Sequence, residues 1–95
     1  MKILICGSRD WNDFTKIKNV LSQYTKQDTL IHGGCRGADA IAGYLAKQMD
    51  IDIIVYKADW KTHCKAAGPI RNQKMIDEGQ PDIVYAFHSD IENSK

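Results

Sequence analysis

The sequence predicts a three-layer α/β domain built on an open parallel sheet. Four short runs rich in isoleucine, valine and leucine are apolar at consecutive positions, as in strands buried on both faces of a parallel sheet. Segments with helical periodicity separate these runs, and such alternation implies right-handed crossovers with helices on both faces. A chain of 95 residues has the size of one domain, so residues 1–95 are expected to form a single unit.

The four strands are expected at Lys2–Cys6, Thr29–His32, Asp52–Tyr56 and Asp82–Phe87. A Rossmann-like order of 3-2-1-4 is the arrangement that we expect for them. The fourth strand would then form an edge with nothing later in the chain to cover it, and a long apolar edge is prone to aggregation. Either a second copy pairs with this exposed strand in a homo-oligomer, which is the partner that we expect, or the chain is C-terminally short and lacks a final helix and strand.

The first two helices are predicted from their apolar stripes. Asn12 or Asp13 suits the N-cap of the first helix. Its apolar positions recur at helical spacing and are Phe14, Ile17, Val20, Leu21 and Tyr24. The second helix has the corresponding positions Ala38, Ile41, Ala42, Leu45 and Met49.

The third helix is predicted from its ends, because its apolar stripe is poor. Pro69 suits the first helical position, and Gly79 suits the residue just past the last turn. Its apolar residues are Ile70, Met75 and Ile76.

The composition limits the classes of partner. With 13 basic and 12 acidic residues, no overall field draws the chain to nucleic acid or to a membrane, so anion recognition has to be local. No apolar run approaches the roughly 18 residues of a membrane span. Three cysteines without paired spacing, and no signal peptide, predict a cytoplasmic protein in a reducing compartment.

All three arginines lie in short loops that contain glycine, whereas the lysines are spread over the rest of the chain. Arg9 lies in Gly7-Ser8-Arg9-Asp10, Arg36 in Gly33-Gly34-Cys35-Arg36-Gly37, and Arg71 in Gly68-Pro69-Ile70-Arg71-Asn72. Arginine presents a planar fork of donors that fits phosphate, and glycine lets backbone N–H groups approach an anion closely. The alternative is that the glycines of the second loop only make a tight turn between strand and helix.

The first two loops follow the first two strands, so they are expected at the carboxyl edge of the sheet. In open α/β sheets, ligands bind at this edge where the strand order reverses, which here is between strands one and four. Neither loop has the spacing of a dinucleotide fingerprint or a Walker lysine. The expected ligand is therefore a phosphorylated molecule held by an unusual glycine and arginine site.

Arg71 is unusual because we expect it in the first turn of the third helix. A cation there faces the positive end of the helix dipole, which costs roughly 0.3–1 kcal/mol, and a bound anion would offset that cost. The alternative is an exposed arginine paired with a nearby carboxylate. Asp39 is either a favourable first-turn acid of the second helix or a hydrogen-bond partner for a ribose hydroxyl or a loop arginine.

Two Asp-Trp pairs add candidate sugar and base contacts. Asp10 precedes Trp11 and Asp59 precedes Trp60, so each pair could hold a sugar and stack on a base. For Trp11 we favour packing on the rim of the core, and for Trp60 both interpretations stay open. The full set of candidate ligand-binding residues is Gly7, Ser8, Arg9, Asp10, Gly33, Gly34, Cys35, Arg36, Gly37, Asp39, Asp59, Trp60, Arg71 and Asn72.

Metal and nucleophile chemistry fit the sequence less well. The spacing of His32, Cys35, His63 and Cys64 does not repeat a zinc pattern, so no metal is expected. Ser8 has no evident activating base, which disfavours a serine nucleophile. No cofactor is expected beyond a nucleotide-derived ligand.

Four blocks in this order resemble the YspA/cpYpsA-related SLOG family and extend over nearly the whole chain. They are Gly7-Ser8-Arg9-Asp10-Trp11, His32–Asp39, Ala58-Asp59-Trp60 and Gly68–Asn72 with Met75. The resemblance implies a Rossmann-like domain that binds nucleotides or nucleotide-derived ligands. The same superfamily includes DprA-type single-strand DNA binders and LOG-type enzymes, which release a base from a nucleoside monophosphate.

The resemblance also has a departure that bears on catalysis. Family members usually continue from the fourth strand into a Gly-Thr turn, a helix and a fifth strand, and in LOG-type enzymes this turn and helix supply a phosphate cradle and the catalytic glutamate. Here the corresponding place reads His88–Lys95, and Glu92 does not lie in such a motif. Binding or sensing of a nucleotide ligand is therefore favoured over hydrolysis.

Two other activities remain as alternatives. LOG-like cleavage of an N-glycosidic bond would use Arg71 or Asp39 as catalytic residues, with Asp10 and Asp59 as further candidates for the general acid or base. Single-strand DNA binding is disfavoured by the near-neutral charge.

Overall fold

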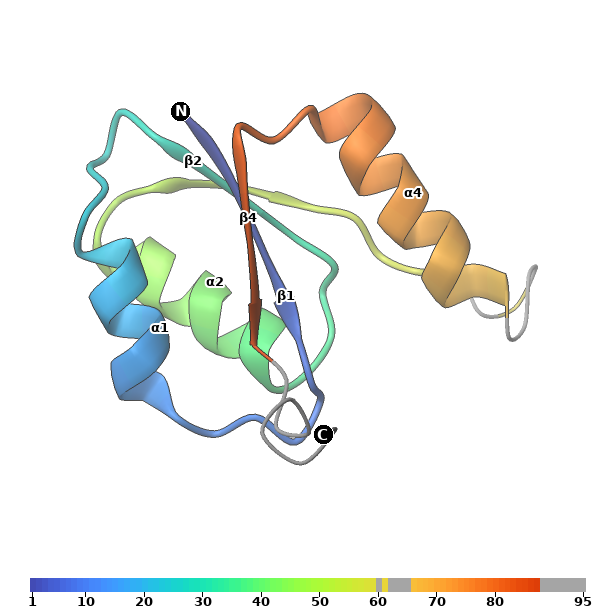
Figure 1. Cartoon of the computed structure of the whole chain (residues 1–95), viewed down its shortest axis with the longest axis horizontal. Helices are drawn as coiled ribbons and strands as arrows, with labels where there is room; N and C mark the ends of the chain where they lie inside the picture. The colour runs from blue at the N-terminus through green and yellow to red at the C-terminus, as the bar shows by residue number, and fades with distance from the viewer. Residues whose placement is uncertain (60, 62–65, 88–95) are drawn as a thin grey trace, which may run out of the picture.

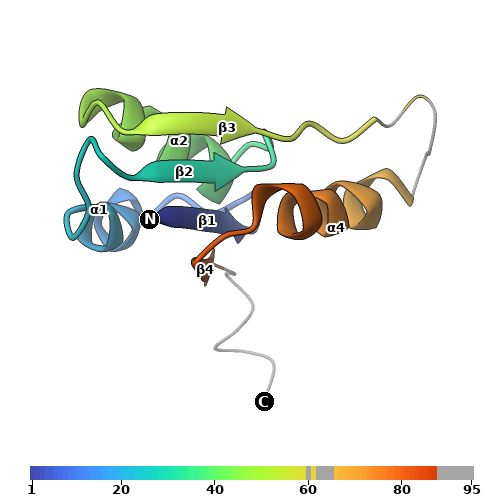
Figure 2. The same ribbon diagram turned by 90° about the horizontal axis from the view of Figure 1, so that it is seen from above.

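The computed structural model of the chain describes residues 1–59, 61 and 66–87. Four strands form one parallel sheet in the order β3-β2-β1-β4, which confirms the predicted topology (Figures 1 and 2). The elements are β1 (Lys2–Gly7), α1 (Phe14–Leu21), β2 (Thr29–His32), α2 (Ala38–Gln48), β3 (Asp52–Val55), α4 (Ala67–Gly79) and β4 (Ile83–Phe87).

One face of the sheet is covered by α1 and α2, which lie together on one side in Figure 1. Alternate residues of β1 point to this face, where Ile3 and Ile5 pack among the apolar residues of both helices. The buried members of this cluster are Ile3, Ile5, Ile17, Leu21, Leu30, Ala38, Ile41, Ala42, Ala46 and Ile51. Asp13 is the N-cap of α1, and its carboxylate accepts the Lys16 N–H. The sequence had predicted either Asn12 or Asp13 at this position.

The opposite face is covered by α4 alone among the described helices, and it buries fewer apolar residues than the face under α1 and α2. Within the described part of the chain, its buried cluster consists of Leu4, Ile31 and Met75, with Cys6 and Tyr56 packed beside them. Helices on both faces confirm the three-layer architecture, but the two layers of packing differ in size.

The expectation that all four strands are buried on both faces is correct for two of them. The central strands β1 and β2 bury consecutive residues, whereas β3 and β4 keep exposed positions such as Val55 and Val84. The reason is that β3 and β4 are the edges of the sheet, and α4 does not extend over either of them fully. Among the described residues β4 pairs only with β1, and its protection by a second copy stays a prediction.

Both predicted ends of the third helix are shifted. The helix α4 begins at Ala67, so Pro69 occupies the third helical position, where its missing N–H costs no hydrogen bond. Gly79 is the last helical residue, and Gln80 instead adopts the left-handed C-cap conformation, with φ of 46°. Gly79 packs closely on the sheet, because a Cβ there would lie 3.0 Å from Ile31 Cδ1, a tight contact that would need a small shift of that side chain.

Candidate functional site

The loops that follow β1 and β2 meet at the carboxyl edge of the sheet. The Ser8 N–H donates to the Phe87 carbonyl at the end of β4, and the Ser8 carbonyl accepts the Ala38 N–H at the start of α2. A side chain on Gly7 would collide with Phe87, and one on Gly37 would collide with the backbone of Ser8 and Arg9. These two glycines therefore bring the first two loops and β4 together, at the point where the strand order reverses.

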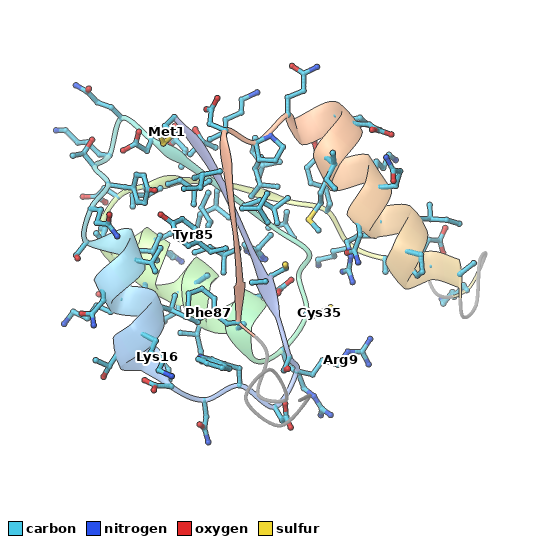
Figure 3. The ribbon with its side chains drawn as sticks, in the orientation of Figure 1. Met1, Arg9, Lys16, Cys35, Tyr85 and Phe87 are labelled. Atoms are coloured by element: carbon cyan, nitrogen blue, oxygen red, sulfur yellow. The ribbon has the colours of Figure 1, made fainter. Side chains whose placement is uncertain are left out.

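An open cavity of about 440 Å³ lies at this junction and is lined by Arg9, Gly34, Cys35 and Arg36. Figure 3 shows Arg9 and Cys35 near one another at this end of the sheet, far from Met1 at the opposite end. Both arginines are exposed and Cys35 is half-buried. Gly34 has a φ of 72°, a conformation that disfavours other residues. Two of the three loop arginines thus line one cavity with a glycine of the second loop.

The neighbouring Gly33 is held between two charged side chains. Its N–H donates to Asp39 Oδ2 at 2.8 Å, and its carbonyl accepts from Arg71 Nη1 at 2.7 Å. A Cβ on Gly33 would lie 2.5 Å from Arg71 Nη1 and 2.9 Å from Asp39 Oδ2, so a larger residue would displace one or both of these side-chain ends. Asp39 is 4% exposed, and in this arrangement it fixes the loop backbone. A direct ligand contact by Asp39 stays a prediction.

Arg71 lies further along α4 than the sequence predicted. Because α4 begins at Ala67, Arg71 lies beyond the first helical turn, where the dipole effect has fallen off. Its guanidinium is half-buried and donates to three neutral acceptors, which are the Gly33 carbonyl, Cys35 Sγ at 3.3 Å and Asn72 Oδ1 at 2.8 Å. Within the described residues it makes no ion pair with a carboxylate, contrary to the alternative weighed above.

His32, the last residue of β2, forms a hydrogen bond with the same loop. Its side chain is 7% exposed, and its Nδ1 accepts the Gly34 N–H at 3.0 Å. Burial lowers the pKa of His32, while the nearby Asp39 carboxylate opposes this effect. The neutral imidazole is therefore the form that holds the loop, because a protonated Nδ1 could not accept.

Cys6 approaches the site from the end of β1. Burial and the Asp39 carboxylate raise the pKa of the Cys6 thiol, and Arg71 partly offsets them. The thiol is therefore favoured over the thiolate, and its described hydrogen bond is a long one to the Tyr85 carbonyl at 3.8 Å. This environment is typical of a packed cysteine rather than of a nucleophile.

A second, smaller cavity of about 140 Å³ adjoins the first and is lined by Lys57, Asp59, Ala67, Ile70, Arg71 and Lys74. Arg71 belongs to this second cavity, so the three loop arginines do not share one pocket. Sequence reasoning did not select Lys57 or Lys74. The available signal was the spacing of positions 67, 70, 71 and 74, which lie on one face of a helix.

The remaining predicted residues are more scattered. Asp10 and Asn72 are exposed, and Asn72 is a partner of Arg71. Trp60 lies outside the described residues, so its role stays a prediction. Trp11 packs against Phe87 with ring centroids 5.4 Å apart, as the core-rim interpretation expected.

The described part of the chain has neither a cluster of metal-ligating side chains nor a membrane-spanning helix. It contains no group of three or more histidine, cysteine, aspartate or glutamate side chains placed to hold a metal ion. None of its helices combines the length and the apolar character that crossing a bilayer requires.

Comparison with known proteins gives two matches. A model of the YspA, cpYpsA-related SLOG family matches residues 1–63, which contain both loops of the larger cavity. The chain is also 35% identical over 95 residues to the Gene 61 protein of Mycobacterium phage D29, an alignment that covers 90% of this chain and 75% of that protein. No solved structure matches.

Proposed function

Because this chain belongs to the YspA, cpYpsA-related SLOG family, we propose that it binds or senses a nucleotide or nucleotide-derived phosphorylated ligand. Membership of this family indicates nucleotide-related binding or processing. The observation that carries the finer proposal is the open cavity lined by Arg9, Gly34, Cys35 and Arg36 at the strand-order reversal.

Each part of this cavity suits an anionic group. Arg9 and Arg36 supply guanidinium donors that can grip a phosphate in two places. Gly34 exposes backbone beside them, and the buried contacts of Gly33 and His32 keep that backbone in one conformation. A preformed loop with two cations at its rim needs little reorganisation when the ligand arrives.

Calorimetric titration with nucleoside mono-, di- and triphosphates and with ADP-ribose tests the proposal. We expect at least one compound to bind the wild type and Arg36→Ala to weaken it about tenfold or more, as loss of a charged hydrogen bond implies. Arg36→Lys should recover little, because lysine lacks the planar fork. The matched control is Lys47→Ala, which removes one charge near the far end of α2 and should bind like the wild type. Equal binding by Arg36→Ala would refute the site.

The hydrolase alternative is separated by analysing the same mixtures for products. Of the carboxylates that could act as a general acid or base, Asp39 is buried and accepts the Gly33 N–H, which gives it a structural role in the loop. Release of free base by the wild type, and its loss in Asp39→Asn or Asp10→Asn, would replace binding by catalysis. A gel shift with single-stranded DNA that persists at physiological salt would instead favour the DNA-binding alternative.

A further inference from the structure

We propose that the smaller cavity is a second anion subsite, so that the ligand carries two separate anionic groups, one on each side of the Gly33-Gly34 turn. This inference rests on the proposed function and adds Lys57 and Lys74 to the residues that recognise the ligand. The ligand class that it names is a nucleotide with two spaced phosphates, such as a nucleoside 3′,5′-bisphosphate.

The first support is the charge around the smaller cavity. Lys57, Arg71 and Lys74 line it together with one carboxylate, Asp59. Among the described lining residues, three cationic side chains therefore face one carboxylate. A small cavity lined mainly by one sign of charge concentrates the field and attracts an ion of the opposite sign.

The second support is the weak pairing of these cations within the described residues. Lys57 makes no ion pair there, and Lys74 approaches Glu78 only at 3.9 Å, between two largely exposed side chains. Arg71 uses its guanidinium on a carbonyl, a thiol and an amide, all of them neutral. Three cations thus converge on one hollow with little compensation, an arrangement that a bound anion would stabilise.

The third support is the position of the two cavities relative to each other. Cys35 lines the larger cavity and receives a hydrogen bond from Arg71, which lines the smaller one. On the other side of the turn, Lys57 packs against Gly34, where a Cβ would come within 3.2 Å of Lys57 Cγ. The wall between the cavities is therefore about one side chain thick, a separation that one small ligand can span.

The helix α4 makes this arrangement possible. Ala67, Ile70, Arg71 and Lys74 occupy one helical face, and this face meets Lys57 and Asp59 in the segment that follows β3. The smaller cavity therefore exists only where α4 packs against the carboxyl edge of the sheet. It adds two lysines from separate parts of the chain to a site whose larger cavity comes from the first two loops.

A titration with inorganic phosphate, followed by amide NMR shifts against sodium chloride of equal ionic strength, tests the subsite. We expect two groups of responding amides, one around Gly34 and Arg36 and one around Lys57 and Lys74. The double variant Lys57→Met/Lys74→Met should lose only the second group. Its control is Lys18→Met/Lys47→Met, which removes the same charge from exposed positions on α1 and α2.

A comparison of adenosine 3′,5′-bisphosphate with AMP tests the ligand class. We expect the bisphosphate to bind the wild type about tenfold more tightly, the gain from one further charged contact, and the gain to disappear in Lys57→Met/Lys74→Met. Because both lysines are exposed, the variant should fold, which circular dichroism checks.

Several outcomes would overturn the inference, and they can be told apart. A phosphate response confined to the amides around Gly34 and Arg36 would remove the second subsite and leave the proposed function intact. No response in either group, with no nucleotide bound, would remove both. A bisphosphate gain that persists in the double variant would show that other residues hold the second phosphate. Tighter binding of a single-stranded oligonucleotide than of the bisphosphate, lost in the same variant, would assign the lysines to nucleic acid instead.

Discussion

The two faces of the sheet differ in how much apolar surface they bury. The face under α1 and α2 has a continuous core that includes Ile3 and Ile5 of the central strand. Among the described residues, the buried apolar cluster under α4 has three members, and Val84 and Ile76 on this face are each 53% exposed. An apolar groove of about 220 Å³ runs between α4 and the strands on this second face. The candidate site involves both faces. The larger cavity is lined by the loops after β1 and β2, the second of which leads into α2, and the smaller cavity is lined by α4.

This difference suggests a division between stability and function. Burial of apolar area is the main stabilising contribution in folding, so the α1/α2 face should determine global stability. The contacts of α4 are fewer and more polar, and regions with few apolar contacts open with lower free energy than the core. We therefore expect the second half of the proposed ligand site to lie on the layer that opens more easily.

The largest expected effect is a difference in the free energy of unfolding between one substitution on each face of the sheet. Ile5 is 0% exposed and Val84 is 53% exposed, and they occupy successive registers of the β1–β4 pair on opposite faces. We expect Ile5→Ala to lower the free energy of unfolding by about 2–5 kcal/mol and Val84→Ala by less than about 1 kcal/mol. Urea denaturation at unchanged m-value measures both. Equal losses would contradict the comparison.

The next largest effect is expected from removing the hydrogen bonds that hold α4 against the loop after β2. Removing the guanidinium with Arg71→Ala deletes its hydrogen bonds to the Gly33 carbonyl and Cys35 Sγ, which should cost about 1–2 kcal/mol. The loss should be local, so amide hydrogen exchange should accelerate in α4 and remain unchanged in the middle of α2. Arg71→Lys keeps the charge but not the planar fork, and should behave almost like Arg71→Ala. Uniform acceleration across both helices would show that α4 is not a separate unit.

A smaller effect probes the rim of the well-packed face. The hydroxyl groups of Tyr24 and Tyr85 are 2.7 Å apart, and this hydrogen bond is the main reason that the pKa of Tyr24 rises to about 12. Tyr24→Phe should cost at most about 1 kcal/mol, because the pair is only partly buried. Tyr44→Phe is the control, since Tyr44 is 58% exposed, and it should change stability by less than about 0.5 kcal/mol. Thermal unfolding compares them, and an equal change in both variants would mean that the hydrogen bond contributes nothing.

The smallest expected effect is a dependence on pH. The pKa of His32 is lower in the folded protein than its ordinary 6.5, so the unfolded chain takes up a proton first as the pH falls. Stability from this residue is therefore complete above about pH 6.5 and declines between that value and the lower folded pKa. His32→Asn keeps an acceptor for the Gly34 N–H and cannot titrate in this range, so its unfolding curves should lack this slope. The same slope in the variant would assign it to other groups.

The sequence was sufficient for the sheet but not for the exact form of α4. Runs such as Lys2–Cys6 predicted each strand to within one residue at its ends, and alternation with helices predicted the order that is observed. The ends of α4 were misplaced, because a proline fits several first-turn positions and a glycine can serve packing as well as capping. For the same reason Arg71 was expected in the first turn, although it lies further along the helix.

The candidate site was predicted where neighbouring loops form it and missed where distant segments meet. Arg9 and Arg36 follow adjacent parallel strands, whose carboxyl ends share an edge, so their proximity followed from the order of strands. Gly33 and Asp39 are joined by a hydrogen bond inside the loop, and their contact with a ligand stays a prediction. Lys57 and Lys74 were missed, because nothing local relates a residue after β3 to one on α4.

The sequence by itself determined the sheet, its strand order and the edge at which the first two loops gather. These features depend on apolar periodicity and on the handedness of crossovers, which are properties of short segments and of chain connectivity. Only the tertiary structure decided that Arg71, on α4, donates a hydrogen bond to the Gly33 carbonyl and lines a separate cavity with Lys57 and Lys74. That outcome depends on the angle and depth at which α4 packs on the sheet, set by contacts such as Gly79 against Ile31. Such contacts join residues far apart in the chain, and no local pattern specifies them.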